Sequence, residues 1–259
     1  MKTIKKLTFA ICLFASSSQG SNKWPVLDAL VGMPSDWQDR HESHSERSDR
    51  LRPWARAIEH VSSGPGDTAA LLALIEHESM AAKRIQFDQC GAHECDGGKA
   101  KGLLQIQKNA CKDAMKIWSM PPNDERFVIE AKCALEVFWE AQERCRGSNS
   151  RGATDGLSGY RGKCKTSDGV LRTNTFITML DVVKNGWPKA PSGWQRDSKP
   201  TKEIRRAALA RMKNLDAEPG DFIPLGDGAG ALVEWHFHEF GGEVRPRGWH
   251  KGLSLYFYE

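Results

Sequence analysis

The sequence lacks an apolar run long enough to anchor it in a membrane. The run from Leu7 to Ala15 is much shorter than the ~20 residues that a membrane-spanning helix needs. The sequence also lacks an excess of charge, because removing the three lysines of residues 1–20 lowers the 37 basic residues to 34, against 33 acidic ones. A nearly neutral chain has no general attraction for polyanions. We therefore expect no nucleic-acid partner and no membrane anchor in the mature form.

Residues 1–20 have the layout of a secretory signal peptide. A lysine-bearing start is followed by the short apolar run and a small, polar exit. We expect these residues to be removed and the mature chain to be secreted or periplasmic. A buried first helix is the less favoured alternative, and bulky Ile11 disfavours lipidation at Cys12.

The cysteines agree with export. Cys12 would leave with the signal peptide, and the six that remain are Cys90, Cys95, Cys111, Cys133, Cys145 and Cys164. An even number in an exported chain predicts disulfides. Sequence alone cannot select the pairing, but proximity favours 90–95, 111–133 and 145–164. The spacing does not match a zinc finger, so we expect no metal and no cofactor.

Composition divides the chain into four parts. Residues 1–20 are the signal peptide and 21–50 a polar lead-in. Residues 51–187 contain several segments with helical apolar spacing. In residues 188–259, a connector rich in proline and glycine leads to a basic helix and two strand-like segments. We expect a mainly α fold with a small C-terminal β-hairpin.

The segment "DTAALLALIEHESMAA", residues 67–82, places two glutamates at the end of an apolar helix. Five apolar residues share the face of Glu78: Leu71, Leu74, Ile75, Ala81 and Ala82. We therefore expect Glu78 to point into the domain and Glu76 to lie nearer its margin. Hydrocarbon surroundings raise the pKa of a carboxyl group, which suits an acid that must deliver a proton near neutral pH. The alternative is an ordinary glutamate at a helix end.

Three ordered segments carry a resemblance to a known family. They are "IEHESM" at 75–80, "GLLQI" at 102–106 and "GLSGYRGKC" at 156–164. Together they resemble the soluble lytic transglycosylase and goose-type lysozyme group over residues 55–185. The resemblance implies a lysozyme-like α+β catalytic domain, here residues 51–187. It also implies an enzyme that cleaves peptidoglycan strands between N-acetylmuramic acid and N-acetylglucosamine.

The resemblance also implies roles for individual residues. Glu78 matches the catalytic acid, and the matching substrate-binding residues are Ser79, Gly102, Leu103, Gln105 and Tyr160. A glycine lets a sugar approach the backbone, and the Gln105 amide offers a donor and an acceptor. The Tyr160 hydroxyl is expected to bond to Glu78 or to the substrate.

The sequence departs from the family pattern at three places. Leu104 replaces a methionine, and Tyr160-Arg161-Gly162 stands where Tyr-Asn-Ala-Gly is common. The link between the first two motifs is longer than usual and contains Asp88, Asp96 and a cysteine pair. We expect this acidic disulfide loop to line the cleft and to favour glycan with free amines. A solvated acidic loop is the alternative.

The sequence leaves open whether the reaction is hydrolysis or anhydro-forming transglycosylation. Hydrolysis commonly uses a second carboxylate, and the candidates are Glu143, Asp155, Asp88 and Asp96. Glu143 is the preferred candidate, because a 145–164 disulfide would bring it near Tyr160; a solvated helix-end glutamate is the alternative. Two other functions remain open, a non-catalytic glycan-binding protein and a zinc peptidase using Glu234, His236 and His238. We expect a monomer.

Overall fold

A computed structural model describes residues 25–34, 39, 41–90, 95–146, 160, 164, 168–226, 228–238 and 248–258. At residues 96, 168–173, 238 and 248 it describes the backbone alone. The signal peptide predicted at residues 1–20 lies outside these ranges. Within them, no helix combines the length and apolar character needed to cross a membrane.

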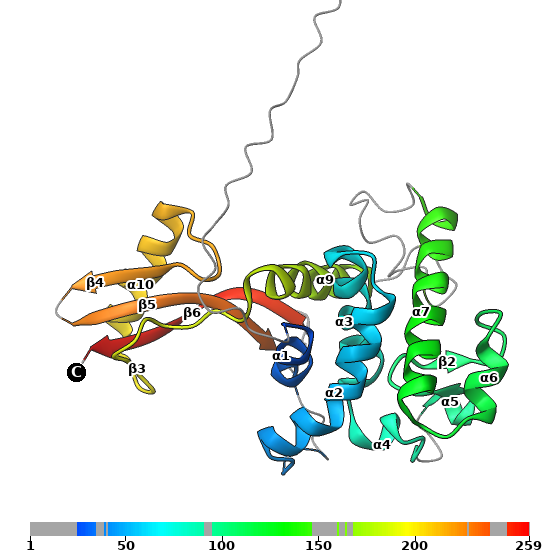
Figure 1. Ribbon diagram of the computed structural model, residues 1–259. Coiled ribbons are helices and arrows are strands. Elements are labelled where there is room, and N and C mark those ends of the chain that lie inside the picture. The colour runs from blue at the N-terminus through cyan, green and yellow to red at the C-terminus, as the bar shows by residue number, and fades with distance from the viewer. Residues whose placement is uncertain are drawn as a thin grey trace, which may run out of the picture.

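The first part of the chain is a helical body (Figure 1). Its helices are α1 (Pro25–Gly32), α2 (His44–Val61), α3 (Pro65–Ser79), α4 (Lys83–Gln86), α5 (Cys95–Gly98), α6 (Ala114–Ser119), α7 (Asp124–Arg144) and α9 (Asp168–Asn185). Helix α3 packs mainly on α9, and α2 packs on α7. A two-stranded sheet of β1 (Ala100–Lys101) and β2 (Ile106–Gln107) lies beside α7.

The last part of the chain forms a four-stranded antiparallel sheet in the order β3-β6-β5-β4. Its elements are β3 (Trp194–Arg196), α10 (Lys202–Leu215), β4 (Phe222–Gly226), β5 (Ala229–His238) and β6 (Gly248–Tyr258). Helix α10 packs on the face that carries Ala231, Val233 and Leu255. The fold is therefore mixed helix and sheet, and an expectation of a mainly α chain with one small hairpin fits only in part. Short β3 and proline-containing β4 gave no alternating apolar signal.

Two helices begin within residues 21–50, the segment expected to be a polar lead-in. Its first helix, α1, buries four apolar residues, namely Val26, Leu27, Ala29 and Leu30. Helix α2 begins inside the charge-dense stretch, where Ser43 and Glu46 form a reciprocal capping box. The lead-in therefore contributes to the same hydrophobic core as α3 and α9.

Aromatic side chains join the sheet to the helical body. The indole of Trp235 in β5 donates a hydrogen bond to Asp181 Oδ2 in α9 over 2.7 Å. Trp249 in β6 is buried and its ring centroid lies 5.2 Å from that of Trp187. Trp249 is therefore a core residue, and the partly buried Trp187 and Trp235 pack against the same core.

Candidate active site

The two glutamates at the end of α3 are buried in the opposite order to the prediction. Glu76 is only 4% exposed and accepts a hydrogen bond from Thr175 Oγ1 of α9 over 3.1 Å, whereas Glu78 is half-buried. Helix α3 is buried on all sides from Thr68 to Glu76. An apolar stripe cannot define the inward face of a helix that is buried all round. Exposure along α3 therefore depends on position along its axis, and its two ends are more accessible than its middle.

The residues after Glu78 adopt an unusual backbone. Helix α3 ends at Met80 in the left-handed conformation, and Ala81 has φ 52°. Of the six described non-glycine residues with positive φ, five lie between Met80 and Gln105. Such conformations cost free energy and are found preferentially at functional sites. This segment is therefore the strongest backbone signal for a site in the helical body.

Arg50 of α2 fastens the segment that follows α3. Its Nη1 donates to the Ala81 carbonyl over 3.0 Å and to Gln86 Oε1 over 2.7 Å. Gln86 returns a hydrogen bond from Nε2 to the Arg50 carbonyl. Ser79 is buried, and its hydroxyl donates to the Ile75 carbonyl over 3.0 Å. Its described contact is therefore within α3, and a substrate contact stays a prediction.

The segment "GLLQ" forms the turn between β1 and β2. Gly102 has φ 68° and Gln105 has φ 52°, and Gln105 donates from both its backbone nitrogen and its side-chain Nε2 to the Gly102 carbonyl. A Cβ at position 102 would overlap the Glu130 carboxyl group. Glycine is therefore required here by Glu130 and by the backbone, which is a different reason from the predicted approach of a sugar.

The third motif meets the second through Tyr160. Its hydroxyl donates a hydrogen bond to the Leu104 carbonyl over 3.0 Å, across 56 residues of sequence. Leu103 and Leu104 have no exposed surface, so both side chains belong to the hydrophobic core. A substrate contact of Leu103 stays a prediction. A bond from Tyr160 to Glu78 or to the substrate stays a prediction.

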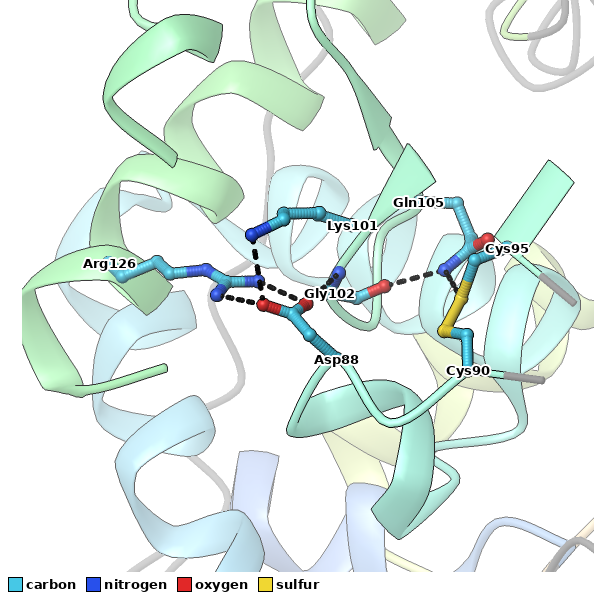
Figure 2. The surroundings of a disulfide bond; sticks show 7 residues. All are labelled: Asp88, Cys90, Cys95, Lys101, Gly102, Gln105 and Arg126. Carbon is cyan, nitrogen blue, oxygen red and sulfur yellow. Dashed lines mark hydrogen bonds and ion pairs between the residues drawn. A yellow bond between two sulfur atoms is a disulfide. The ribbon is translucent and has the colours of Figure 1, made fainter. Parts of the chain in front are cut away.

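Asp88 lies inside the fold and not on an open acidic wall (Figure 2). Its carboxylate accepts two hydrogen bonds from Arg126, of 2.5 and 2.7 Å, and one from the Gly102 backbone nitrogen, and Lys101 lies 3.4 Å away. Burial alone would raise the pKa of Asp88, but the hydrogen bonds and charge of Arg126 hold the pKa below its ordinary value. Asp88 therefore holds the turn in place, and the predicted acidic wall loses this residue.

Glu130 of α7 is a buried carboxyl group that the sequence analysis missed. Arg126 Nε donates to its Oε1 over 2.6 Å, and both side chains have no exposed surface. Among the described residues, no group donates to Glu130 Oε2, which faces Gly102. Desolvation, helped by the negative charge of Asp88, outweighs the charge and hydrogen bond of Arg126 and raises the pKa of Glu130 to about 8.

A signal for Glu130 was present in the sequence. It lies three residues after Phe127 and four before Ala134, so it shares the apolar face of its helix. The argument that singled out Glu78 applies equally to Glu130. It also has an arginine four residues earlier, a spacing at which side chains meet on a helix.

Four residues are candidates for a second carboxylate. Among those whose side chains the structure describes, only Asp88 lies at the turn between β1 and β2. Glu143 is exposed and forms an ion pair of 2.5 Å with Arg146. It lies thirteen residues after Glu130, or about 20 Å along the helix axis. Its exposure and its pairing with Arg146 agree with a solvated helix-end glutamate, and a role for Glu143 as the second carboxylate stays a prediction. Asp155 and the side chain of Asp96 lie outside the described residues.

The disulfides agree with the proximity prediction. The structure pairs Cys90 with Cys95, Cys111 with Cys133, and Cys145 with Cys164. The first closes the loop before the turn, where Gln105 Nε2 lies 3.5 Å from Cys95 Sγ (Figure 2). The second ties the segment before α6 to α7. The third lies at the end of α7, away from the turn between β1 and β2.

The zinc-peptidase alternative finds no support in the described side chains. Within them, no three His, Cys, Asp or Glu residues form a group that could hold a metal ion. His236 Nε2 lies 3.3 Å from Glu234 Oε1, and the His238 side chain lies outside the described part.

Comparisons with known proteins do not assign the chain to a family. No family model matches it, and neither a curated protein nor a solved structure matches it. The candidate site therefore rests on its own geometry and on the three resembling segments.

Proposed function

We propose that this chain is a secreted peptidoglycan glycosidase in which Glu78 is the general acid. The observation that carries the proposal is the hydrogen bond between Tyr160 and the Leu104 carbonyl. It joins two of the three segments that resemble lytic transglycosylases, which lie far apart in the sequence. Glu78 itself ends a buried helix and is half-exposed, as a proton donor to an external substrate must be.

Within this proposal, the anhydro-forming reaction is favoured over hydrolysis. Glu78 gives its proton to the glycosidic oxygen as the bond from that oxygen to C1 breaks. The C6 hydroxyl of the same muramic acid then bonds to C1, and its proton passes to the Glu78 carboxylate. This reaction needs no second carboxylate, and both described candidates are used elsewhere: Asp88 is bound to Arg126, and Glu143 is remote from the turn.

Three disulfides support an oxidising compartment for the enzyme. A preference for deacetylated glycan is not part of the proposal, because Arg126 neutralises Asp88. The proposed substrate is the glycan strand of peptidoglycan, and the protein acts on it as a monomer.

The test compares Glu78→Gln with Glu76→Gln in the release of soluble fragments from purified sacculi. Both variants remove one carboxylate from the last turns of α3, and the amide introduced by Glu76→Gln can still accept the hydrogen bond from Thr175. We expect Glu78→Gln to lower the initial rate by about 10²- to 10⁴-fold and Glu76→Gln to keep most of it. Full activity of Glu78→Gln, or selective loss in Glu76→Gln, would contradict the assignment of the acid.

Mass spectrometry of the released fragments separates the remaining alternatives. Fragments with 1,6-anhydro ends support the proposed reaction, whereas reducing ends indicate a hydrolase. Wild-type protein that binds sacculi and releases no fragments would show a glycan-binding protein instead of an enzyme.

A further inference from the structure

A cavity of about 540 Å³ lies along the edge of β6 and shares no residue with the candidate active site. Strand β6, helix α10 and the connector between β3 and α10 form its walls. Four consecutive β6 residues, from Gly252 to Leu255, line it. Because side chains alternate between the faces of a sheet, four in a row can line a cavity only along the strand's edge.

The edge of β6 is open here because β3 is short. The two strands pair from Trp194 and Tyr258 to Arg196 and Tyr256, and Asp197 N–H then bonds to the Leu255 carbonyl over 2.7 Å. In an antiparallel ladder, alternate residues direct both backbone groups to the same side, so Leu253 faces the same edge. No described strand pairs with β6 on this side beyond Leu255. An unpaired edge is a template for an added strand.

The charged residues that line the cavity are Arg196, Arg205 and Asp197. The Asp197 carboxylate already accepts the Lys199 backbone N–H over 2.8 Å. Glu234, next to the cavity, accepts from Arg196 Nη2 over 3.0 Å and from Ser254. Arg205 lines the cavity from α10; its backbone N–H donates to the Thr201 carbonyl, and its guanidinium has no hydrogen-bond or ion-pair partner among the described residues. A guanidinium in this position fits a carboxylate.

The rest of the lining suits an extended chain with apolar side chains. Leu209 of α10 lines the cavity and is 52% exposed. Gly252 allows the His236 ring to cross β6 and reach the cavity, since a Cβ at position 252 would come within 2.8 Å of that ring. The volume lies within the ~300–1,000 Å³ typical of small-ligand sites.

We propose that this cavity binds a short extended peptide of L-residues that ends in a free carboxylate. The peptide adds to the sheet beside β6, its carboxylate faces Arg205, and an apolar side chain contacts Leu209. The ladder geometry selects L-residues, because a D-residue disfavours the required backbone conformation. This binding does not depend on the proposed glycosidase activity.

The probe is fluorescein-labelled Ala-Val-Ala-Val with a free carboxyl terminus, titrated with the full chain and followed by fluorescence anisotropy. We expect saturable binding that weakens at least about tenfold, or about 1.4 kcal/mol, when the carboxyl terminus is amidated. The same peptide ending in D-valine should weaken similarly. An absence of saturable binding, or equal binding of the amidated peptide, would overturn the proposal.

Two variants of α10 provide the matched test on the protein. Arg205→Gln and Arg206→Gln each remove one exposed positive charge, but only Arg205 lines the cavity. We expect Arg205→Gln to weaken binding about tenfold and Arg206→Gln to change it less than about twofold. Equal weakening by both variants would show attraction to the basic helix in general and would overturn the site.

Discussion

Two arginine–carboxylate clusters, one in the helical body and one in the sheet, use the same chemistry in different surroundings. Arg126 has no exposed surface and contacts Asp88 and Glu130, whereas the Arg196 side chain is 62% exposed and contacts Glu234. A buried charge that loses its partner is costly, while an exposed pair contributes little to stability. The comparison indicates that the first cluster contributes to the stability of the fold, whereas the second contributes little because solvent reaches Arg196.

The difference follows from the secondary structure around each cluster. From Asp88 to Gln105 the described chain contains only one short helix and two-residue β1, so few ladder or helix bonds fix its path. The Cys90–Cys95 disulfide and the Arg126 cluster supply that restraint. In the sheet, β5 and β6 pair over ten residues, and the ladder itself fixes the register.

The largest expected effect comes from removing each arginine charge. We expect Arg126→Met to lower the free energy of unfolding by about 3–5 kcal/mol, because it leaves buried Glu130 without its hydrogen-bond donor and Asp88 with only Lys101 as a cation. Arg196→Met should cost less than about 1 kcal/mol, because water already solvates that pair. Urea unfolding with intact disulfides measures both.

A third variant sharpens this comparison. Replacing Asp88 by Asn and Glu130 by Gln in the Arg126→Met background removes both carboxyl groups that have lost Arg126, so it should recover part of the lost stability. If Arg126→Met and Arg196→Met lower the free energy of unfolding equally, burial does not determine how much each cluster contributes to stability.

Much of the helical body could be predicted from sequence because its signals are local. Apolar spacing indicated α3 and α7, and proximity along the chain favoured the three disulfides. Strands β3 and β4 could not be predicted, since three to five residues carry too little alternation and their pairing depends on distant β5 and β6.

The candidate site was harder to predict because burial depends on the partners of a helix. Sequence spacing placed Glu76 at the margin of the apolar face of α3. In the structure, α9 packs on this part of α3, and its Thr175 donates a hydrogen bond to Glu76. Asp88 looked like a loop acid, and only the three-dimensional fold brings it to Arg126, 38 residues later. The exposure of Glu76 and Asp88 therefore depends on tertiary contacts, which local sequence patterns do not reveal.

The second prediction concerns pH, and it separates Glu130 from Asp88. Burial raises the pKa of Glu130 from 4.5 to about 8, so between these values the folded state holds a proton that the unfolded state releases. Stability must therefore fall as pH rises through this window, by up to about 1.4 kcal/mol per pH unit. We expect Glu130→Gln to remove this slope and to be the more stable protein at pH 8.

Urea unfolding of both proteins at intervals from pH 5 to pH 8 measures the effect. Asp88 does not interfere, because its pKa is lowered from 3.8 and its contribution is lost only as pH falls below that value. Parallel stability curves for the two proteins would show that Glu130 is ionised in the folded state throughout the window.

The smallest expected effect distinguishes two tyrosines. Tyr160→Phe removes the hydroxyl that donates to the Leu104 carbonyl and should lower the free energy of unfolding by about 1 kcal/mol. Tyr258→Phe in the sheet, at a side chain that is 58% exposed and packs its ring against Trp194, should cost less than about 0.5 kcal/mol. Thermal unfolding of both variants tests this order. Equal small losses would mean that the Tyr160 hydroxyl does not stabilise the turn. A role of Tyr160 in the candidate site would then depend on contact with substrate. Such a role would lower the rate of fragment release from sacculi and leave the free energy of unfolding unchanged.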